Sequence, residues 1–301
     1  MSSSKVFFVT GGTGRIGTAF VHEMASRGHT VRLGTRNPAK AESVLRANFG
    51  PGIVEPVVMS IDDQSGLEKA LEGCTGGLLV APFGEMKTWH QKMTEAAVAQ
   101  NVSHLVKVSV TGARGPDNDP PPGRIPSMHW EGEEIVRASG IPSTVIRPTI
   151  FAQHFFGLSQ ILFSKGSDKF YLPTGDTKVA WLDCRDIAIC AAAILSSEEK
   201  CSDFAGAAFE LTGPTAVSAA EIATILGAVS GRDIQHVDGM DAFTKRAQEL
   251  ELPDMVKGIY QEAAEGWFSK VENQEFFQLT GRYTTSFAKY AFDHASWFAA
   301  K

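Results

Sequence analysis

A glycine-rich turn constrains the fold of this chain more than any other feature of its sequence. The segment VFFVTGGTGRIGTAF (residues 6–20) starts with a β-favouring run and continues into a GxxGxxG pattern formed by Gly11, Gly14 and Gly17. Between a strand and a helix, the first glycine permits a tight turn, the second lets a pyrophosphate approach the backbone, and the third allows close packing. The amino-terminal end of the helix also favours an anion. The pattern therefore predicts a dinucleotide-binding site.

Strand and helix signals alternate through the first half of the chain. Apolar residues at helical spacing predict a helix that starts at Ile16 and stops at Gly28. The alternation indicates βαβ units in a parallel sheet, and so a Rossmann-like, doubly wound α/β fold for residues 1–150. The expected strands are 6–10, 30–35, 53–59, 76–83, 104–110 and 143–149, and the other expected helices are 38–49, 65–71, 88–101 and 130–139.

The pattern changes after residue 150, where connections lengthen and helices dominate. Residues 151–301 are predicted to form a smaller, mainly helical substrate-binding lobe over one end of the sheet, with some segments returning to the sheet itself. Ser218 and Glu221 form a capping box ahead of an apolar run. The proline-rich segment 115–126 is predicted to be an irregular loop, either a lid or, as we favour, a solvated connector. Further helices are expected at 241–250, 254–269 and 286–299.

Composition and charge argue against several classes of function. The net charge of −6 is not that of a nucleic-acid-binding protein. The four cysteines form no CxxC pair and do not cluster with histidines, so we expect reduced thiols and no metal site. The longest apolar stretch, residues 187–195, is about half the length that crosses a bilayer. We therefore expect a cytoplasmic protein, monomeric or homodimeric, that acts on a small molecule without a membrane or nucleic-acid partner.

The end of the second predicted strand, RLGTRNPAK, distinguishes between cofactors. NAD-binding proteins usually have an acidic residue there for the ribose 2′-hydroxyl, but this chain has Arg36, with Lys40 one helical turn later and Arg15 in the glycine turn. Either these side chains are merely solvated or, as we favour, they bind the 2′-phosphate of NADP. The fourth strand should end near the cofactor ribose and nicotinamide. The predicted cofactor-binding residues are therefore Gly11, Thr13, Gly14, Arg15, Ile16, Gly17, Arg36, Lys40, Ala81, Pro82 and Phe83.

Several segments together resemble the NmrA-like group of atypical short-chain dehydrogenases/reductases. They are VTGGTGRIG, TRNPAK, DDQSGLEKALEG, VKVSVTGA, HWEGEEIVRASGIPSTVIRPTIFAQHF and DCRDIA, within about residues 6–190, and the later LTGPTAVSAAEIATILGAVSGR. The resemblance implies a Rossmann domain with a small C-terminal lobe. It also implies either an NADPH-dependent reductase, similar to quinone and azo-compound reductases and fungal ergot-alkaloid imine reductases, or a redox-sensing regulator that binds the nucleotide without turnover.

The usual proton relay of such enzymes is absent. Ordinary short-chain dehydrogenases use a Tyr-x-x-x-Lys pair, and the related isoflavone-reductase-like enzymes use a lysine in the helix after the fifth strand. None of the four tyrosines has a lysine four residues later, and MHWEGEEIVR has no lysine, with His129 near its place. The candidate catalytic residues are therefore His129 and Ser109, which ends the fifth strand. For His129 we favour a structural role over a catalytic one, and Ser109 would bind substrate or cap a backbone group.

Other residues near the expected site have simpler interpretations. Glu131, Glu133 and Glu134 indicate a solvated helix face, with Glu133 supporting Arg137 at i,i+4, and Asp186 indicates a helix N-cap. Aromatic residues just beyond the sixth strand are usually core, but they could also wall a pocket for a flat, apolar substrate. The candidate substrate-binding residues are Phe151, His154, Phe155 and Trp181.

The sequence thus predicts an NADPH-dependent reductase that transfers hydride to a conjugated, electron-poor acceptor: a quinone, an imine or iminium ion, an enone or an azo compound. Without the Tyr–Lys pair or a metal, nothing would stabilise the negative charge that forms on the oxygen of an ordinary ketone, so the substrate must already be activated. The alternative is a non-catalytic regulatory protein that senses NADP(H).

Overall fold

The computed structural model describes residues 4–45, 52–82, 84–118, 123–155 and 161–299. The chain divides into two units that alternate along the sequence. The first unit contains Met1–Pro148, Arg185–Glu210 and Gln278–Gly281. The second contains Thr149–Cys184, Leu211–Phe277 and Arg282–Lys301.

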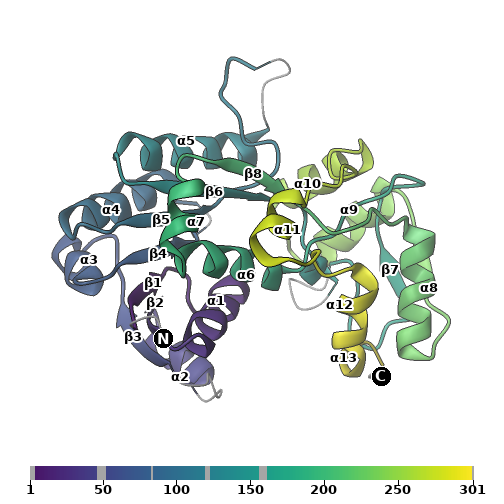
Figure 1. The fold of residues 1–301 in the computed structure, drawn as a ribbon. Helices are drawn as coiled ribbons and strands as arrows, with labels where there is room; N and C mark the ends of the chain where they lie inside the picture. Colours follow the sequence, from purple (N-terminus) through teal and green to yellow (C-terminus); the bar gives the residue numbers. More distant parts are fainter. Residues whose placement is uncertain (1–3, 46–51, 83, 119–122, 156–160, 300–301) are drawn as a thin grey trace. The chain divides into compact units, whose positions relative to one another are not determined.

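Seven strands form the central sheet of the first unit (Figure 1). In chain order they are β1 (Val6–Val9), β2 (Thr30–Thr35), β3 (Ile53–Val58), β4 (Gly76–Leu79), β5 (His104–Val108), β6 (Ser143–Pro148) and β8 (Ala208–Leu211). Across the sheet the order is β3-β2-β1-β4-β5-β6-β8. Strands β1 to β6 pair in parallel. Because the order reverses between β1 and β4, their carboxyl ends form the topological switch point where such sheets bind ligands.

The last strand, β8, continues the parallel direction of the sheet. The backbone amide of Val145 donates to the carbonyl group of Ala207, and that of Thr149 donates to the carbonyl group of Leu211. Since these partners advance together along both segments, β6 and β8 run in the same direction. The doubly wound, Rossmann-like α/β fold that the alternating signals predict is therefore confirmed.

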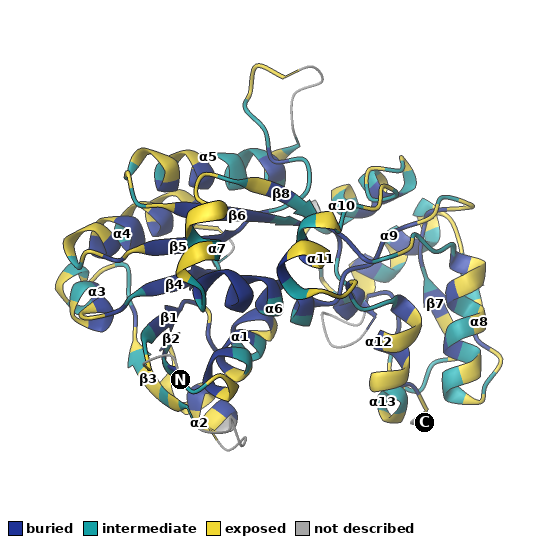
Figure 2. Ribbon diagram, viewed as in Figure 1, coloured by how far each residue is buried: buried dark blue, intermediate teal, exposed yellow. Residues whose placement is uncertain are grey.

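Helices cover both faces of this sheet (Figure 1). They are α1 (Arg15–Ser26), α2 (Pro38–Leu45), α3 (Gln64–Leu71), α4 (Met86–Ala99), α5 (Arg124–Ala138), α6 (Cys184–Leu195) and α7 (Glu198–Asp203). On one face, an apolar cluster joins Phe8, Leu79 and Leu105 of the strands to α3, α4 and α5, with Trp89 and Val136 among its members. Figure 2 shows the central strands as a buried layer, whereas the helices keep an exposed side.

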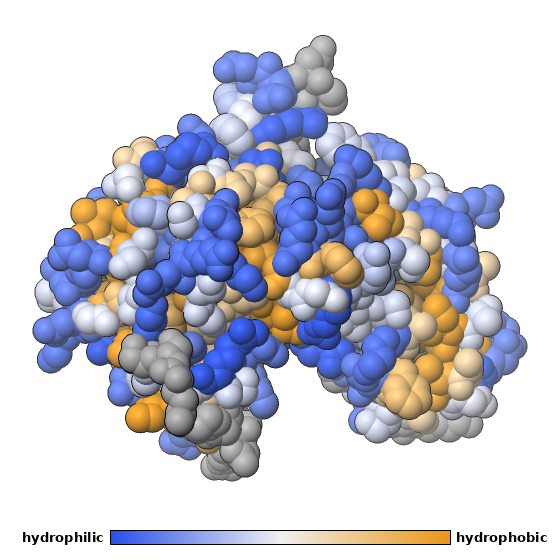
Figure 3. Space-filling model, viewed as in Figure 1, coloured by the Kyte–Doolittle hydropathy of each residue, from blue (hydrophilic) through white to orange (hydrophobic). Residues whose placement is uncertain are grey.

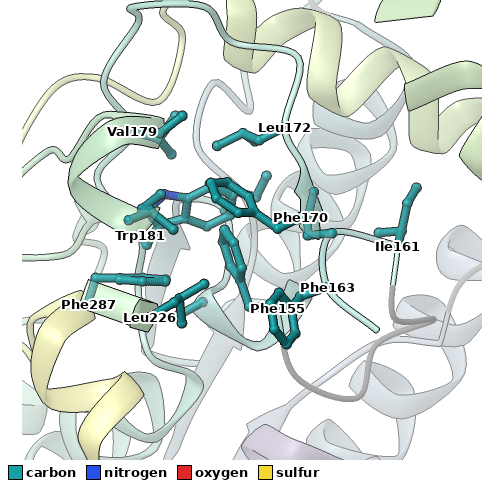
Figure 4. Packing of buried hydrophobic residues seen from close by; sticks show 14 of the residues in the cluster. Phe155, Ile161, Phe163, Phe170, Leu172, Val179, Trp181, Leu226 and Phe287 are labelled. Carbon is teal, nitrogen blue, oxygen red and sulfur yellow. The ribbon is translucent and has the colours of Figure 1, made fainter. Parts of the chain in front are cut away.

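The second unit has its own apolar core (Figure 4). Within it, the ring of Phe155 lies 5.0 Å from the rings of both Trp181 and Phe287. Two short parallel strands, β7 (Lys169–Tyr171) and β9 (Gln235–Val237), form a separate sheet. The helices of this unit are η1 (Ala152–His154), a 3₁₀ turn, and α8 (Ala219–Ser230), α9 (Met240–Glu249), α10 (Met255–Ala264), α12 (Phe287–Asp293) and α13 (Ala295–Ala299). Helix α11 (Gln274–Thr280) begins in this unit and ends in the first.

The structure confirms one of three local predictions from the sequence and corrects the other two. The capping box is confirmed, because the Ser218 side chain accepts from the Glu221 amide and the Glu221 carboxylate accepts from the Ser218 amide over 2.7 Å. Asp186 is not an N-cap: it lies inside the first turn of α6. Helix α5 begins at Arg124, so the irregular segment is shorter than 115–126. Pro126 fits the first helical turn because an amide there has no partner within the helix.

Three predicted helices have other bounds in the structure: α5 begins at Arg124 and not at 130, α10 ends at Ala264 and not at 269, and the segment 286–299 is divided. The segment 286–299 contains two helices, because His294 has non-helical backbone angles of φ −110° and ψ 21° between α12 and α13. The helix expected over 38–49 is described as far as Leu45, and residues 46–49 lie outside the described part of the chain.

Candidate nucleotide-binding and catalytic site

The glycine turn between β1 and α1 has the geometry that its sequence predicts. Gly11 has a φ of +61°, a conformation that residues with a side chain rarely adopt. A Cβ atom on Gly17 would lie 2.3 Å from the carbonyl oxygen of Gly11, so only glycine lets the helix approach the turn this closely. Gly14 is exposed at the N-cap position of α1. The start of this helix, which favours an anion, is therefore at an exposed position of the turn.

A cavity of about 410 Å³ lies beside this turn, at the carboxyl ends of β1 to β4. Four predicted cofactor-binding residues, Arg15, Ile16, Gly17 and Lys40, are not among those that line it. Ile16 and Gly17 are buried, so they shape the turn rather than its surface. Phe83 lies outside the described residues. The predicted residues that do line the cavity are Gly11, Thr13, Gly14, Arg36, Ala81 and Pro82.

Arg36 is the basic side chain of this cavity. It is exposed just after β2, where an acidic residue would hold the ribose 2′-hydroxyl of NAD. The cavity also contains the carboxylates of Asp62 and Glu85. Because Arg15 and Lys40 do not line the cavity, the preference for a 2′-phosphate over a hydroxyl group rests on Arg36.

Ten further residues of the cavity were not identified from the sequence. Thr10 ties β1 to β4, because its hydroxyl donates to the Val80 carbonyl over 3.2 Å and accepts from the Val80 amide over 2.8 Å. Most of the ten lie at the carboxyl end of a parallel strand or directly after it. Residues in this position are expected to line a ligand site, so the sequence could have identified them. The other eight are Gly34, Thr35, Met59, Ser60, Ile61, Asp62, Glu85 and Trp89.

A buried polar network lies at the carboxyl ends of β5 and β6, against α5. The Ser109 hydroxyl donates to Oε1 of Glu133 over 2.5 Å. Arg147 donates to both oxygens of the same carboxylate, over 3.0 and 2.6 Å. Burial opposes the charge of Arg147, but the hydrogen bonds and the charge of Glu133, together with the charge of Glu210, raise its pKa overall. The Glu133 carboxylate therefore already accepts three hydrogen bonds from protein groups.

This network corrects the interpretation of the three glutamates in α5. Glu131 and Glu134 are exposed, as expected of a solvated helix face, but Glu133 is 1% exposed. Its closest cation is Arg147 at 2.6 Å, and Arg137 lies 3.9 Å away. The prediction that Glu133 is solvated was wrong because its decisive partners, Ser109 after β5 and Arg147 on β6, are not its neighbours in the helix, whereas the predicted i,i+4 pair with Arg137 is present. The Ser109 hydroxyl gives its proton to this carboxylate and not to a backbone carbonyl group.

His129 lies in α5, one helical turn before Glu133. Its Nδ1 atom is buried and has no hydrogen-bond partner in the described part of the chain, whereas the residue as a whole is partly exposed. Burial, together with the charges of Lys107 and His90, lowers the pKa of His129 well below its usual value. The imidazole is therefore neutral at pH 7, and in that form one ring nitrogen accepts a proton while the other donates one.

The four candidate substrate-binding residues lie in the second unit and form two pairs. Phe155 and Trp181, 0% and 1% exposed, belong to the apolar core in Figure 4, so the structure supports the core interpretation for both. Phe151 and His154 are half-buried, with their rings 6.2 Å apart in a T-shaped arrangement. His154 Nδ1 also lies 2.6 Å from the hydroxyl of Tyr260, which the sequence did not single out for the site. A role of this second pair in substrate binding stays a prediction.

Residues 3–288 match the NmrA-like family. The chain belongs to this family. The resemblance inferred from its motifs is thus confirmed. Two curated relatives of this NmrA-like protein match almost its whole length. An NAD(P)H azoreductase of Xenophilus azovorans is 29% identical over 98% of this chain and 100% of its own length. A (4-alkanoyl-5-oxo-2,5-dihydrofuran-3-yl)methyl phosphate reductase of Streptomyces griseus is 30% identical over 98% of this chain and 99% of its own.

Solved structures show the same fold with different activities. The triphenylmethane reductase of Citrobacter sp., complexed with NADP(H), matches with a TM-score of 0.77 at 21% identity, over 96% of this chain and 99% of its own. NmrA, a negative transcriptional regulator in complex with NAD, matches with a TM-score of 0.74 at 17% identity, over 97% and 95%. The NmrA-like fold therefore occurs in a reductase and in a regulator.

The described helices of this NmrA-like protein include none with the length and apolar character of a membrane span. On the face shown in Figure 3, hydrophilic residues cover much of the surface and separate smaller apolar areas.

Proposed function

We propose that this NmrA-like protein is an NADPH-dependent reductase that transfers hydride to a conjugated, electron-poor acceptor: a quinone, an imine or iminium ion, an enone or an azo compound. One observation carries the proposal: the glycine turn and Arg36 line a single cavity at the switch point of a parallel sheet. These residues fit the cofactor because the turn exposes its backbone, α1 begins there, and a cation stands where NAD sites have an acid.

Each wall of the cavity has a distinct part in holding the cofactor. Gly11 and Gly14 have no side chain, so the pyrophosphate can approach their backbone, and Arg36 pairs with the 2′-phosphate. Ala81 and Pro82 border the cavity at the end of β4, on the side of β5, and suit the nicotinamide half. When bound, NADPH supplies the hydride. The relatives named as an NAD(P)H azoreductase and a furanone phosphate reductase support this assignment.

The polar groups near β5 argue for an activated acceptor. Reduction of an ordinary ketone places negative charge on oxygen, and an enzyme must stabilise that charge with preorganised donors. The described α5 holds no lysine, and the Ser109 hydroxyl is directed to Glu133. A quinone or an azo compound delocalises the incoming charge, and an iminium ion is neutralised by hydride. The azo group and the furanone ring in the names of the two relatives are conjugated acceptors of this kind.

Consumption of NADPH with a panel of acceptors tests the proposal. The panel contains a benzoquinone, a cyclic imine, a cyclic enone, an azo dye and an aliphatic ketone, with a secondary alcohol and NADP⁺ for the reverse reaction. We expect at least one conjugated class to react roughly 100-fold faster than the aliphatic ketone, the order of magnitude that oxyanion stabilisation contributes. Efficient turnover of the plain ketone or alcohol would contradict the proposed acceptor class.

A nucleotide-sensing regulator is the second candidate, and one observation favours it. Ser109, Glu133 and Arg147 satisfy one another's hydrogen bonds, so this network offers little to a substrate. Calorimetry separates the two functions. Tight NADPH binding without turnover of any acceptor would favour the regulator, and no binding of NADPH or NADH would refute both.

A further inference from the structure

A lysine is buried inside the first unit, next to the candidate catalytic residues. Lys107 lies on β5 with 0% of its surface exposed. Its ammonium can donate three hydrogen bonds, but in the described part of the chain Nζ donates only one, to the carbonyl oxygen of Val108 over 3.4 Å. Burial lowers the pKa of Lys107 to about 7, the negative charge of Glu133 opposes this shift, and the positive charge of Arg147 adds to it. Because this ammonium is buried and makes one hydrogen bond where it could make three, it loses its proton easily.

Two neutral histidines lie close to Lys107. His90, on α4, is fully buried, and its Nδ1 lies 2.7 Å from the carbonyl oxygen of Met86, an arrangement that places the ring proton on Nδ1. Its Nε2 is then an acceptor, and this atom has no partner in the described residues. Burial and the charge of Lys107 lower the pKa of His90 to about 3. His129, on α5, directs a second buried and unpartnered nitrogen, Nδ1, into the interior.

The packing of α4 against α5 leaves room for the His90 ring. Gly132 of α5 faces His90 of α4, and a Cβ atom at Gly132 would lie 2.6 Å from Cε1 of the His90 ring. Even an alanine at this position would therefore displace the histidine. Lys107 is the register partner of Leu79 on β4, and the residues that follow Leu79, from Val80 to Pro82, line the nucleotide cavity. The buried lysine is thus one strand away from that cavity.

The carboxylates near Lys107 are paired with arginines rather than with the lysine. The groups that interact with it from the packed elements are Glu133 and His129 on α5, His90 on α4 and Arg147 on β6. Both histidines are neutral. The Glu133 carboxylate accepts hydrogen bonds from Arg147 and the Ser109 hydroxyl and lies 3.9 Å from Arg137, while the charge of Glu210 also acts on Arg147. In the described part of the chain, by contrast, Lys107 forms no direct ion pair with a carboxylate, and its Nζ donates only to a backbone carbonyl group. A guanidinium does not lose its proton in proteins, so Lys107 is the group that gives one up.

We propose that Lys107 is a buried proton reserve for the reductase and that it acts through His129. The inference rests on the proposed function. After hydride reaches the acceptor, its oxygen or nitrogen takes a proton from the exposed edge of the His129 ring. The lysine side chain turns from the Val108 carbonyl group to the unpartnered Nδ1 of His129 and gives it a proton, and Lys107 becomes a neutral amine. A proton from solvent then returns to the exposed edge of the His129 ring, and Nδ1 passes its proton back to Lys107. Both groups are restored before the next turnover, and one hydride and one proton are consumed per acceptor. Lys107 is a positioning residue in this scheme, because it does not touch the substrate.

Nuclear magnetic resonance of isotope-labelled lysine side chains tests the first half of the inference. We expect one lysine signal to titrate near neutral pH in the wild type and in Lys92→Met, and to be missing in Lys107→Met. Lys92 is the matched control because it lies on α4 beside the same layer but forms an exposed ion pair with Glu95. If every lysine titrated near its ordinary value, the proton reserve would be refuted without any activity measurement.

The dependence of kcat on pH tests the second half. In the wild type, kcat should fall above pH 7 as Lys107 loses its proton. Lys107→Met should lower kcat at pH 6 by roughly 10- to 100-fold, at or below the lower end of the range for a positioned proton donor, and should remove the alkaline decrease while KM for NADPH stays constant. Lys107→Arg separates the two possible roles, because arginine keeps the charge but cannot release the proton.

The outcomes distinguish this inference from the proposed function. If Lys107→Arg restored the wild-type rate, the lysine would serve as a fixed charge and the proton reserve would be wrong. An active enzyme whose Lys107→Met variant kept the wild-type rate and pH profile would also refute it. If the wild-type chain oxidised NADPH with none of the acceptors in the panel, the proposed function itself would be refuted. Thermal melting of both variants shows whether a lost rate reflects a lost fold.

Discussion

Replacing Lys107 with methionine should stabilise the protein at neutral and acidic pH. The side chain is fully buried, and its pKa is lowered from 10.5 to about 7 by burial. Since one pKa unit corresponds to about 1.4 kcal/mol, the folded state carries a penalty of about 5 kcal/mol for this ammonium at a pH where both states are protonated. Methionine has a similar length and no charge to desolvate, so Lys107→Met should recover much of this penalty.

The stabilisation should also shrink as the pH rises. Between pH 7 and 10.5 the unfolded chain binds more protons at Lys107 than the folded chain does, so the stability of the wild type increases with pH at this residue. From pH 7 to pH 9 the penalty decreases by about 2 kcal/mol, and it disappears above the unfolded pKa. The stability advantage of Lys107→Met should therefore be largest below pH 7, and at pH 9 it should be about 2 kcal/mol smaller than at pH 7.

Urea unfolding of the wild type, Lys107→Met and Lys92→Met at pH 6, 7.5 and 9 measures this difference. Comparing variants at each pH cancels the titration of all other groups. Lys92→Met should follow the wild type within a few tenths of a kcal/mol, as is usual for an exposed ion pair. A Lys107→Met advantage that stayed constant with pH would refute the reasoning, and so would a variant less stable than the wild type throughout.

Three further predictions concern the turn, the cavity and the polar network. Arg36→Ala should weaken NADPH binding by roughly 10- to 100-fold and leave NADH nearly unchanged; equal losses in calorimetry would remove Arg36 from the phosphate site. Gly17→Ala should destabilise the fold by about 1–3 kcal/mol or more in thermal melting, whereas Gly258→Ala, with open space around its Cβ position, should not. Glu133→Gln should cost about 3–5 kcal/mol because the partly buried Arg147 loses the charge of its buried partner; unchanged urea unfolding would show the pair to be dispensable.

Local signals explain how much of the fold and of the site could be predicted from the sequence. The turn at Gly11, Gly14 and Gly17 is fixed by steric contacts within seven residues, and it occurs as its spacing predicts. Strand β2 matches its expected bounds, and most other strands end within one or two residues of theirs. Arg36 could be placed in the cavity because the residue after a strand is positioned by that strand alone.

Contacts between distant segments explain what the sequence could not show. Glu133 looks like a surface residue when only its helical neighbours are considered. It is buried because it packs against Arg147 on β6 and Ser109, which directly follows β5. Lys107 was overlooked for a related reason. A lysine within an apolar strand shows its unusual environment only once α4 and α5 cover that face of the sheet and bring His90 with them.

The alternation of the two units along the chain has a consequence for how the protein is made. The backbone passes between the units five times, and β8, the last strand of the central sheet, begins only at residue 208. A ribosome must therefore synthesise the intervening segment of the second unit before the sheet of the first can be completed. Until then β6 presents an unpaired edge of the kind that recruits other strands. A fragment that stops at residue 150 would keep this edge permanently, and we expect it to aggregate rather than fold as an independent nucleotide-binding domain.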